Sequence, residues 1–234
     1  MKHFVRITSS TEGVINVKQG EPFELECVAV GSYSPSLDWY KDGVRVTDGE
    51  DNNYISRFDV TRGIIRYIVD CAQPKHSGSY SCEAVTGTVT ASSPQQVRVH
   101  VSRKFHYLLY KMSPRLMKSG GVCRQDQQLP RITRYSPVVM QNIGTDVKLV
   151  CRTQGFPRPD VYWTDKSGNI LDTSAGSRFK ILDSGDLIIK SVRWPDMGNY
   201  MCAAENRFGK DITSTFLYPM MVSYPLLIYF HFIY

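Results

Sequence analysis

The sequence carries none of the short motifs that mark common catalytic or nucleotide-binding sites. It has no Gly-rich phosphate loop, no H-E-x-x-H zinc motif, no G-x-S-x-G nucleophile turn and no EF-hand calcium loop. The five histidines are scattered, without metal-ligand spacing: His3, His76, His100, His106 and His231. We therefore expect no catalytic residue, no metal site and no cofactor, and predict a protein that is not an enzyme but works by surface contact.

Long apolar segments are also lacking at both ends of the chain. The N-terminal stretch MKHFVRITSS has no apolar core of the kind found in secretory signal peptides. The C-terminal stretch 220–234 is apolar but has only 15 residues and is interrupted by Pro225 and His231, whereas a membrane span needs about 20. We predict no transmembrane segment, and we interpret the tail as an extra strand or a sticky segment, with membrane contact as the alternative.

Basic charge is concentrated in one stretch. The net charge is +6, and residues 102–134 hold eight Lys and Arg residues against Asp126 alone, a local charge of 8 − 1 = +7. No nucleic-acid-binding motif accompanies this stretch, so we expect no nucleic-acid partner. A solvated linker is the simpler interpretation, and weak contact with an acidic glycosaminoglycan is the alternative.

Six cysteines, none in a C-x-x-C arrangement, favour disulfide bonds over zinc or redox sites. Disulfides form in oxidising compartments, so the composition predicts a secreted, extracellular protein. Because the chain shows no signal peptide, we expect either that its true start is missing or that export is unconventional.

A four-residue pattern occurs twice along the chain. Trp follows the first Cys by twelve residues in both copies, the second Cys follows the first by 55 or 51 residues, and a Tyr stands two places before the second Cys. The copies are Cys27, Trp39, Tyr80 and Cys82, and Cys151, Trp163, Tyr200 and Cys202. This spacing is typical of immunoglobulin sandwiches, in which the disulfide joins two sheets beside the Trp and the Tyr hydroxyl bonds upstream backbone.

The segments around these residues alternate apolar and polar side chains, as half-buried strands do. FELECVA and VKLVC show this period before the first cysteines, and IIRYIVD and GDLIIKSV predict later strands. We therefore predict an all-β chain of two tandem immunoglobulin-like sandwiches. The expected boundaries are residues 1–101 for the first sandwich, 102–134 for a long basic linker, 135–219 for the second sandwich and 220–234 for the tail.

The two predicted sandwiches differ at the turn before the Tyr. In the second, Arg178 and Asp196 are placed to form the ion pair that bridges the base of many immunoglobulin domains, and the Asn206–Gly209 turn indicates the intermediate type. The first has His76 where the acid would be. Its corresponding ion pair is therefore absent or depends on pH.

Two cysteines, Cys71 and Cys123, remain after these pairs are assigned. Cys71 ends a predicted strand at the same pole of the sandwich from which the linker carrying Cys123 departs. We hypothesise a third disulfide that ties the linker to the first sandwich. Free thiols and intermolecular bonds are the alternatives.

Residues 184–219 closely resemble the corresponding end of the secreted two-immunoglobulin proteins of invertebrates. This group includes the nematode zwei-Ig proteins and the insect neural/ectodermal development factor that binds insulin-like peptides. The resemblance rests on Gly185-Asp186-Leu187, Trp194, Asp196-Met197-Gly198, Tyr200, Cys202, Gly209-Lys210-Asp211 and Thr215-Phe216-Leu217-Tyr218-Pro219. In the first domain it rests on the sandwich core and on Cys71 and Cys123, which look like the additional cysteines of some zwei-Ig proteins.

The resemblance implies a secreted, non-catalytic binding protein. One implied function is binding insulin-like peptides and so modulating insulin signalling. The alternative is a neuronal adhesion or maintenance factor that holds axon and cell-body positions through contact with adhesion molecules. Apolar hormone faces would require an exposed apolar patch on a sandwich face or on the tail, whereas adhesion tolerates a polar, charge-patterned surface.

Overall fold

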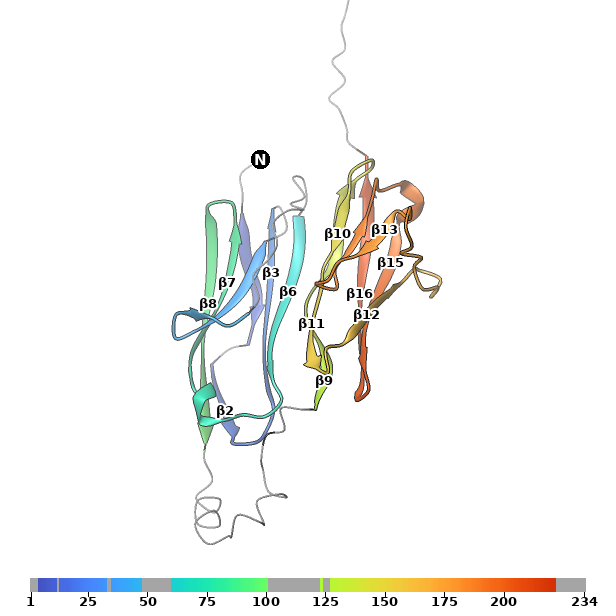
Figure 1. Cartoon of the computed structure of the whole chain (residues 1–234). Coiled ribbons are helices and arrows are strands. Elements are labelled where there is room, and N and C mark those ends of the chain that lie inside the picture. Colours follow the sequence, from blue (N-terminus) through green and yellow to red (C-terminus); the bar gives the residue numbers. More distant parts are fainter. Residues whose placement is uncertain are drawn as a thin grey trace, which may run out of the picture.

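The computed structural model describes residues 4–11, 13–32, 35–47, 60–100, 123 and 127–221 (Figure 1). Most of the predicted linker and of the C-terminal tail lie outside these residues. The described chain is built from strands and two short 3-10 turns, η2 (Pro74–His76) and η3 (Trp194–Asp196). The predicted all-β class with two sandwiches is confirmed.

The first sandwich consists of two packed sheets. One of its sheets contains the strands β1 (Val5–Ser10), β3 (Phe23–Ser32) and β6 (Val60–Val69), in that order. The other sheet runs in the order β2 (Val14–Lys18), β8 (Val89–His100), β7 (Gly78–Thr86), β4 (Ser36–Lys41) and β5 (Val44–Arg45). Strand β3 shows the predicted alternation, because Phe23, Leu25 and Cys27 are buried between the sheets while Glu24 is exposed.

The second sandwich follows the same plan. Its strands are β9 (Gln128–Asn142), β10 (Val147–Leu149), β11 (Cys151–Phe156), β12 (Asp160–Thr164), β13 (Phe179–Ile181), β14 (Leu187–Ile189), β15 (Gly198–Asn206) and β16 (Gly209–Met220). A three-stranded sheet in the order β10-β14-β13 faces the sheet that contains β9, β16, β15 and β12. The core between them holds Trp163, Leu149 and Leu217, all fully buried.

Strand β9 belongs to both sandwiches. It pairs antiparallel with β6 of the first sandwich and with β11 of the second, and its C-terminal part pairs parallel with β16. The strand order β1-β3-β6-β9-β16-β15-β12 is therefore one continuous sheet that crosses the junction between the two sandwiches, which lie side by side (Figure 1). Strand β9 supplies partners for the edge of β6 at Arg62, Ile64 and Ile65, with a register shift between Arg62 and Ile64.

Strand β9 begins at Gln128, before residue 135, where the sequence analysis predicts the start of the second sandwich. Residues 128–134, assigned there to the basic linker, form the first half of the strand. Their basic and polar composition hides this role, since the strand is stabilised by neighbours on both sides that are distant in sequence.

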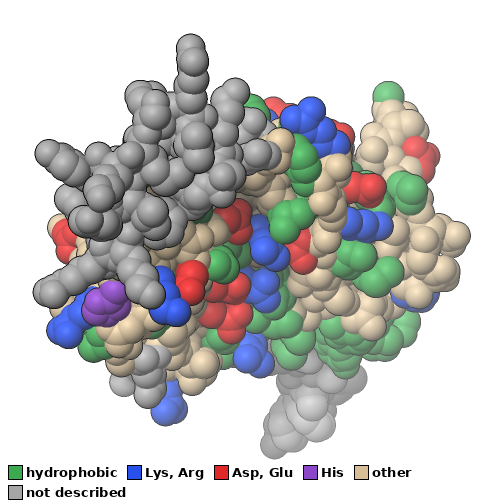
Figure 2. Space-filling view, turned by 90° about the horizontal axis from the view of Figure 1, so that it is seen from below, with side chains coloured by type: hydrophobic (Ala, Val, Ile, Leu, Met, Phe, Trp, Pro, Cys, Tyr) green, Lys and Arg blue, Asp and Glu red, His purple; other side chains and the backbone are tan. Residues whose placement is uncertain are grey.

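Side chains reinforce the junction around β9. The guanidinium of Arg134, which is only 4% exposed, reaches β4, where it bonds the carbonyl of Leu37 and lies 3.1 Å from Asp38. On β6, Arg66 donates to the Tyr135 hydroxyl at 3.3 Å and stacks over its ring. Charged side chains of both signs gather over the middle of the molecule in Figure 2. The two sandwiches are therefore joined by backbone bonds, a buried ion pair and aromatic contact.

Candidate protein-binding interface

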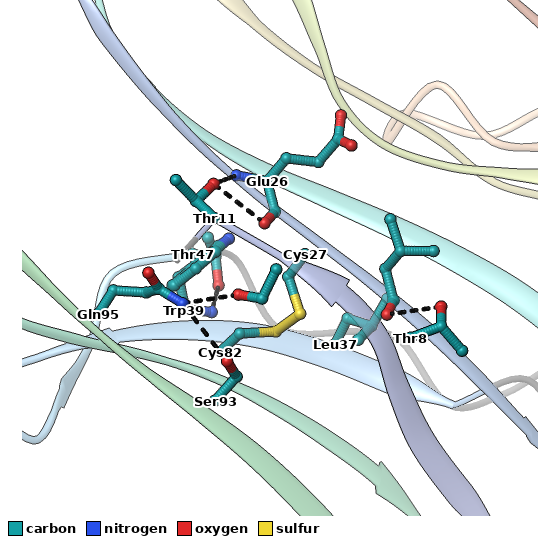
Figure 3. The surroundings of a disulfide bond; sticks show 12 residues. Thr8, Thr11, Glu26, Cys27, Leu37, Trp39, Thr47, Cys82, Ser93 and Gln95 are labelled. Carbon is teal, nitrogen blue, oxygen red and sulfur yellow. Dashed lines mark hydrogen bonds between the residues drawn. A yellow bond between two sulfur atoms is a disulfide. The ribbon is translucent and has the colours of Figure 1, made fainter. Parts of the chain in front are cut away.

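The repeated four-residue pattern forms the centre of each sandwich. Disulfides join Cys27 to Cys82 and Cys151 to Cys202, with Cα atoms 6.3 and 6.5 Å apart. Each bonded pair is fully buried, and so is the Trp of its sandwich, Trp39 or Trp163. Figure 3 shows Trp39 beside the first disulfide, near Gln95, whose side-chain amide donates to hydroxyls of Ser10 and Ser93. These residues hold the sheets together and are not available to a partner.

The Tyr of each copy ties the turn that precedes its strand. Tyr80 donates its hydroxyl to the carbonyl of His76 at 2.8 Å, and Tyr200 donates to the carbonyl of Asp196 at 3.0 Å. Burial raises the pKa of both phenols, with Asp196 adding to the effect at Tyr200, whose pKa rises to about 12. Both hydroxyls therefore remain protonated donors at any physiological pH.

The corner of the second sandwich is locked by an ion pair. Two guanidinium nitrogens of Arg178 lie 2.6 and 3.2 Å from the two carboxylate oxygens of Asp196. This hydrogen-bonded pair raises the pKa of Arg178, burial opposing it, and the same carboxylate accepts the backbone N–H of Arg193 at 2.7 Å. Asp196 thus caps the η3 turn and anchors strand β13 through Arg178.

A third disulfide joins Cys71 to Cys123, with the Cα atoms 5.6 Å apart. Cys71 follows the end of β6, and Cys123 stands five positions before the start of β9. The bond therefore connects the ends of two strands that are paired in the continuous sheet. It fixes the start of β9 against the strand that it must reach.

The described residues contain no group of three or more His, Cys, Asp or Glu side chains that could hold a metal ion. Within the same residues, no helix is long and apolar enough to cross a membrane.

One outer sheet face of the second sandwich is rich in exposed apolar side chains. Cross-strand partners share a face, and Tyr218 lies opposite Met140 while Ile212 lies opposite Ala203. We call this surface the apolar face; its exposed residues are Val138 (37%), Met140 (36%), Met201 (39%), Ile212 (53%) and Tyr218 (41%). Trp194, which is 47% exposed, extends it by packing edge-on against Tyr218 with 6.3 Å between ring centroids.

The apolar face has a polar rim at its β12 side. The ammonium group of Lys210 bonds the Tyr162 hydroxyl and lies 5.0 Å from the centre of that ring. The bond to Tyr162 is the largest of the causes that raise the pKa of Lys210, with Glu205, its cross-strand neighbour, adding to them. The lysine therefore keeps its positive charge beside the apolar surface.

The first sandwich has no matching surface among its described residues. Its large exposed apolar side chains stand apart on different segments: Phe4, Val14 on β2, Val44 on β5 and Val85 on β7. Isolated exposed apolar residues are ordinary, whereas a group on one sheet face indicates an interface.

The sequence analysis named Tyr218 and Trp194 only as part of the family resemblance and assigned no residue to a binding face. A signal was present in β16, where Ile212, Phe216 and Tyr218 occupy positions of one parity while the buried Thr215 and Leu217 occupy the other. Apolar residues of both parities in a strand indicate that both of its faces contact apolar material. The contribution of β9 and β15 could not be read locally, because it depends on which strands pair.

Comparison with known proteins places these features in context. The immunoglobulin domain family matches residues 6–85 and 130–206. The neural/ectodermal development factor IMP-L2 of Drosophila melanogaster is 27% identical over 224 residues, 93% of this chain and 78% of the relative. Zwei Ig domain protein zig-2 of Caenorhabditis elegans is 29% identical over 218 residues, 88% of this chain and 82% of the relative.

A solved structure agrees with the arrangement of both sandwiches. The crystal structure of neural ectodermal development factor IMP-L2 superposes with a TM-score of 0.73 at 26% identity. The match covers 94% of this chain and 96% of that chain. Since it extends over nearly the whole of both chains, the similarity includes both sandwiches.

Proposed function

The chain belongs to the immunoglobulin domain family, with two-domain relatives, and from this premise we propose that it is a secreted, non-catalytic protein that binds insulin-like peptides and thereby modulates insulin signalling. The apolar face of the second sandwich is the observation that carries the proposal. Insulin-like peptides present apolar helical surfaces, which need an exposed apolar counterpart. Binding the free hormone lowers its concentration by mass action.

The disulfides support the extracellular part of the proposal. All six cysteines are paired, and paired cysteines are characteristic of oxidising compartments. The proposed mechanism requires no bond-making step. A rigid sheet that already presents its apolar side chains loses little conformational entropy when a partner docks.

The polar rim indicates how the orientation of a docked partner is selected. Lys210 places a positive charge next to Tyr162 and Ile212, within reach of a partner that docks on the apolar face. A hormone with a carboxylate beside its apolar helical surface would satisfy both the apolar face and this lysine. Charges at a rim mainly set association rate and register, while the apolar centre supplies affinity.

We test the proposal by calorimetric titration of the purified protein with a panel of insulin-like peptides. At least one peptide is expected to bind at micromolar concentration or tighter. The variant Ile212→Arg, which puts a charge among the side chains of the apolar face, is expected to weaken binding at least tenfold. Ile212 is 53% exposed, so the substitution leaves the melting temperature nearly unchanged.

Val14→Arg is the matched control, because Val14 is similarly exposed at 46% but lies on the first sandwich. It should leave binding unaltered. If no peptide gives a heat of binding at micromolar concentration, the proposal is contradicted. That result would favour the alternative, a neuronal adhesion or maintenance factor. Equal weakening by both variants would show that the apolar face is not the contact surface.

A further inference from the structure

The imidazole of His76 is part of a hydrogen-bonded turn in the first sandwich. The backbone N–H of Gln73 donates to Nδ1 of His76 at 2.9 Å and so caps the η2 turn. A backbone N–H can only donate, and Nδ1 can accept only while it carries no proton. The turn therefore requires a neutral imidazole with its proton on Nε2.

The surroundings of the ring also favour its neutral form. Burial is the main cause that lowers the pKa of His76, and the cations Lys75 and Lys41 add to it. From β3, the ring of Phe23 meets the imidazole with 6.2 Å between centroids at 62°, an edge contact without charge. Lys41 is in turn paired with Asp42.

The other strands near the turn supply hydroxyls and exposed charges. Tyr80 on β7 bonds the His76 carbonyl, and Tyr67 of β6 packs against Tyr80. Strand β8 packs against the turn through Val99, whose N–H donates to the Ser77 hydroxyl, and exposes Arg98 and His100 on either side of it. The cations that act on the ring, Lys41 and Lys75, both disfavour a positive charge on the imidazole.

The second sandwich builds the same turn with a different acceptor. Asp196 takes the place of His76 and accepts the N–H of Arg193 at 2.7 Å while paired with Arg178. A carboxyl group has two oxygens and keeps an acceptor even when one of them carries a proton, whereas Nδ1 of an imidazole does not. The two corners are thus alike in geometry but differ in whether protonation removes the acceptor of the cap.

We propose that the His76 corner is an acid-sensitive switch. Its capping hydrogen bond stabilises the η2 turn of the first sandwich at neutral pH, and in mildly acidic compartments the bond is lost and the turn opens. Protonation would convert Nδ1 from an acceptor to a donor facing the N–H of Gln73, so the cap bond is lost. The turn lies between Cys71, where the disulfide holds the chain near β9, and strand β7. Opening of the turn loosens the end of the first sandwich where the Cys71–Cys123 disulfide holds the chain near β9.

The direction of the pH dependence follows from the preference for neutral imidazole. A histidine whose pKa is lower in the folded state stabilises that state fully above its unfolded pKa of about 6.5. The stabilisation is lost progressively as the pH falls below that value toward the folded pKa. With one proton involved, the unfolding equilibrium constant of the first sandwich rises by at most about tenfold per pH unit.

The test uses the full chain and two measurements. Nitrogen NMR of the His76 imidazole at pH 7.5 should show an unprotonated Nδ1, and titration should give a pKa below 6.5. Hydrogen exchange by mass spectrometry at pH 7.5 and 5.5, corrected for intrinsic exchange chemistry, should show up to about tenfold faster opening of η2 and β7 at the lower pH. The corresponding η3 and β15 amides should not change.

Reciprocal variants separate the effect of the His76 switch from other effects of low pH on the stability of the protein. His76→Asp should abolish the acid-dependent opening of the first sandwich, and Asp196→His should create it in the second. His100→Gln, which removes an exposed histidine of β8, should leave the behaviour of the native chain. The proposal is overturned if the opening persists in His76→Asp, or if the imidazole titrates at or above 6.5. The second criterion uses the native chain and applies even if a variant does not fold.

Discussion

The two sandwiches share one central constellation but close their edges differently. The second carries its own strand β13 beside β14 and locks its corner with the Arg178–Asp196 pair. The first has β6 covered by β9, a strand that also belongs to the second sandwich. The comparison teaches that similar cores do not make independent domains, because the first sandwich depends on its neighbour to complete a sheet and the reverse dependence is weaker.

The largest expected effect comes from removing one core disulfide at a time. Each closes a loop of 51 or 55 residues, and its loss costs about 4 kcal/mol of unfolding free energy in the chain-entropy model. Replacing Cys27 and Cys82 by Ala should open the first sandwich and leave the second protected. Replacing Cys151 and Cys202 should open both, because β9 is lost as a partner of β6.

Hydrogen exchange of the two double variants, followed separately for β3 and β15, measures this asymmetry. The wild-type chain under the same conditions is the control. Equal and independent opening of the two sandwiches in the two variants would mean that β9 does not support the first.

A smaller effect is expected from Arg134→Met. The change removes the nearer cation of Asp38, which is 8% exposed, and leaves Arg45 at 4.0 Å as its ionic partner. Breaking a buried ion pair on one side costs about 3 kcal/mol, and the loss should fall on the first sandwich. Hydrogen exchange at increasing denaturant concentration, followed separately for β3 and β15, measures the loss in each sandwich.

Arg131→Ala is the matched control for this prediction. Arg131 also lies on β9 and faces an acid of the first sandwich, but its side chain is 41% exposed and 3.9 Å from Asp70. Exposed pairs contribute under about 1 kcal/mol. If both variants lose the same stability, the buried pair has no special role at the junction.

The smallest effect is expected at the corner of the second sandwich. Arg178→Ala removes the bonds to Asp196 but leaves that carboxylate as the cap of η3 through the N–H of Arg193. We expect a loss of about 1 to 2 kcal/mol of unfolding free energy, confined to the second sandwich. Thermal unfolding at low and high salt measures it, and a loss in the first sandwich instead would contradict the assignment.

Much of the fold was predictable because it depends on residue types at fixed spacing within each half of the chain. The spacing of Cys27, Trp39 and Tyr80, repeated in the second half, predicts a sandwich centre, and the period of two in FELECVA predicts which side chains of β3 are buried. These signals need only local sequence, since strand alternation and the Tyr corner are set within a few residues.

The apolar face was much less predictable. The apolar face combines Met140, Met201 and Ile212 from three strands, and none of the three segments is unusual by itself. Residues 128–134 of β9 were assigned to the linker for the same reason, as their basic residues suggest a linker when read locally. Arg134, counted as part of a solvated basic stretch, is instead among the most buried charged residues.

The amino-acid sequence by itself determined the two sandwich centres and the different acceptors at their corners, His76 and Asp196, because these depend on residue type at fixed spacing. Only the tertiary structure decided that β9 joins two sandwiches in one sheet and that apolar side chains from β9, β15 and β16 share a face. Strand pairing links residues far apart in the chain, and its outcome depends on packing across the whole molecule rather than on local pattern.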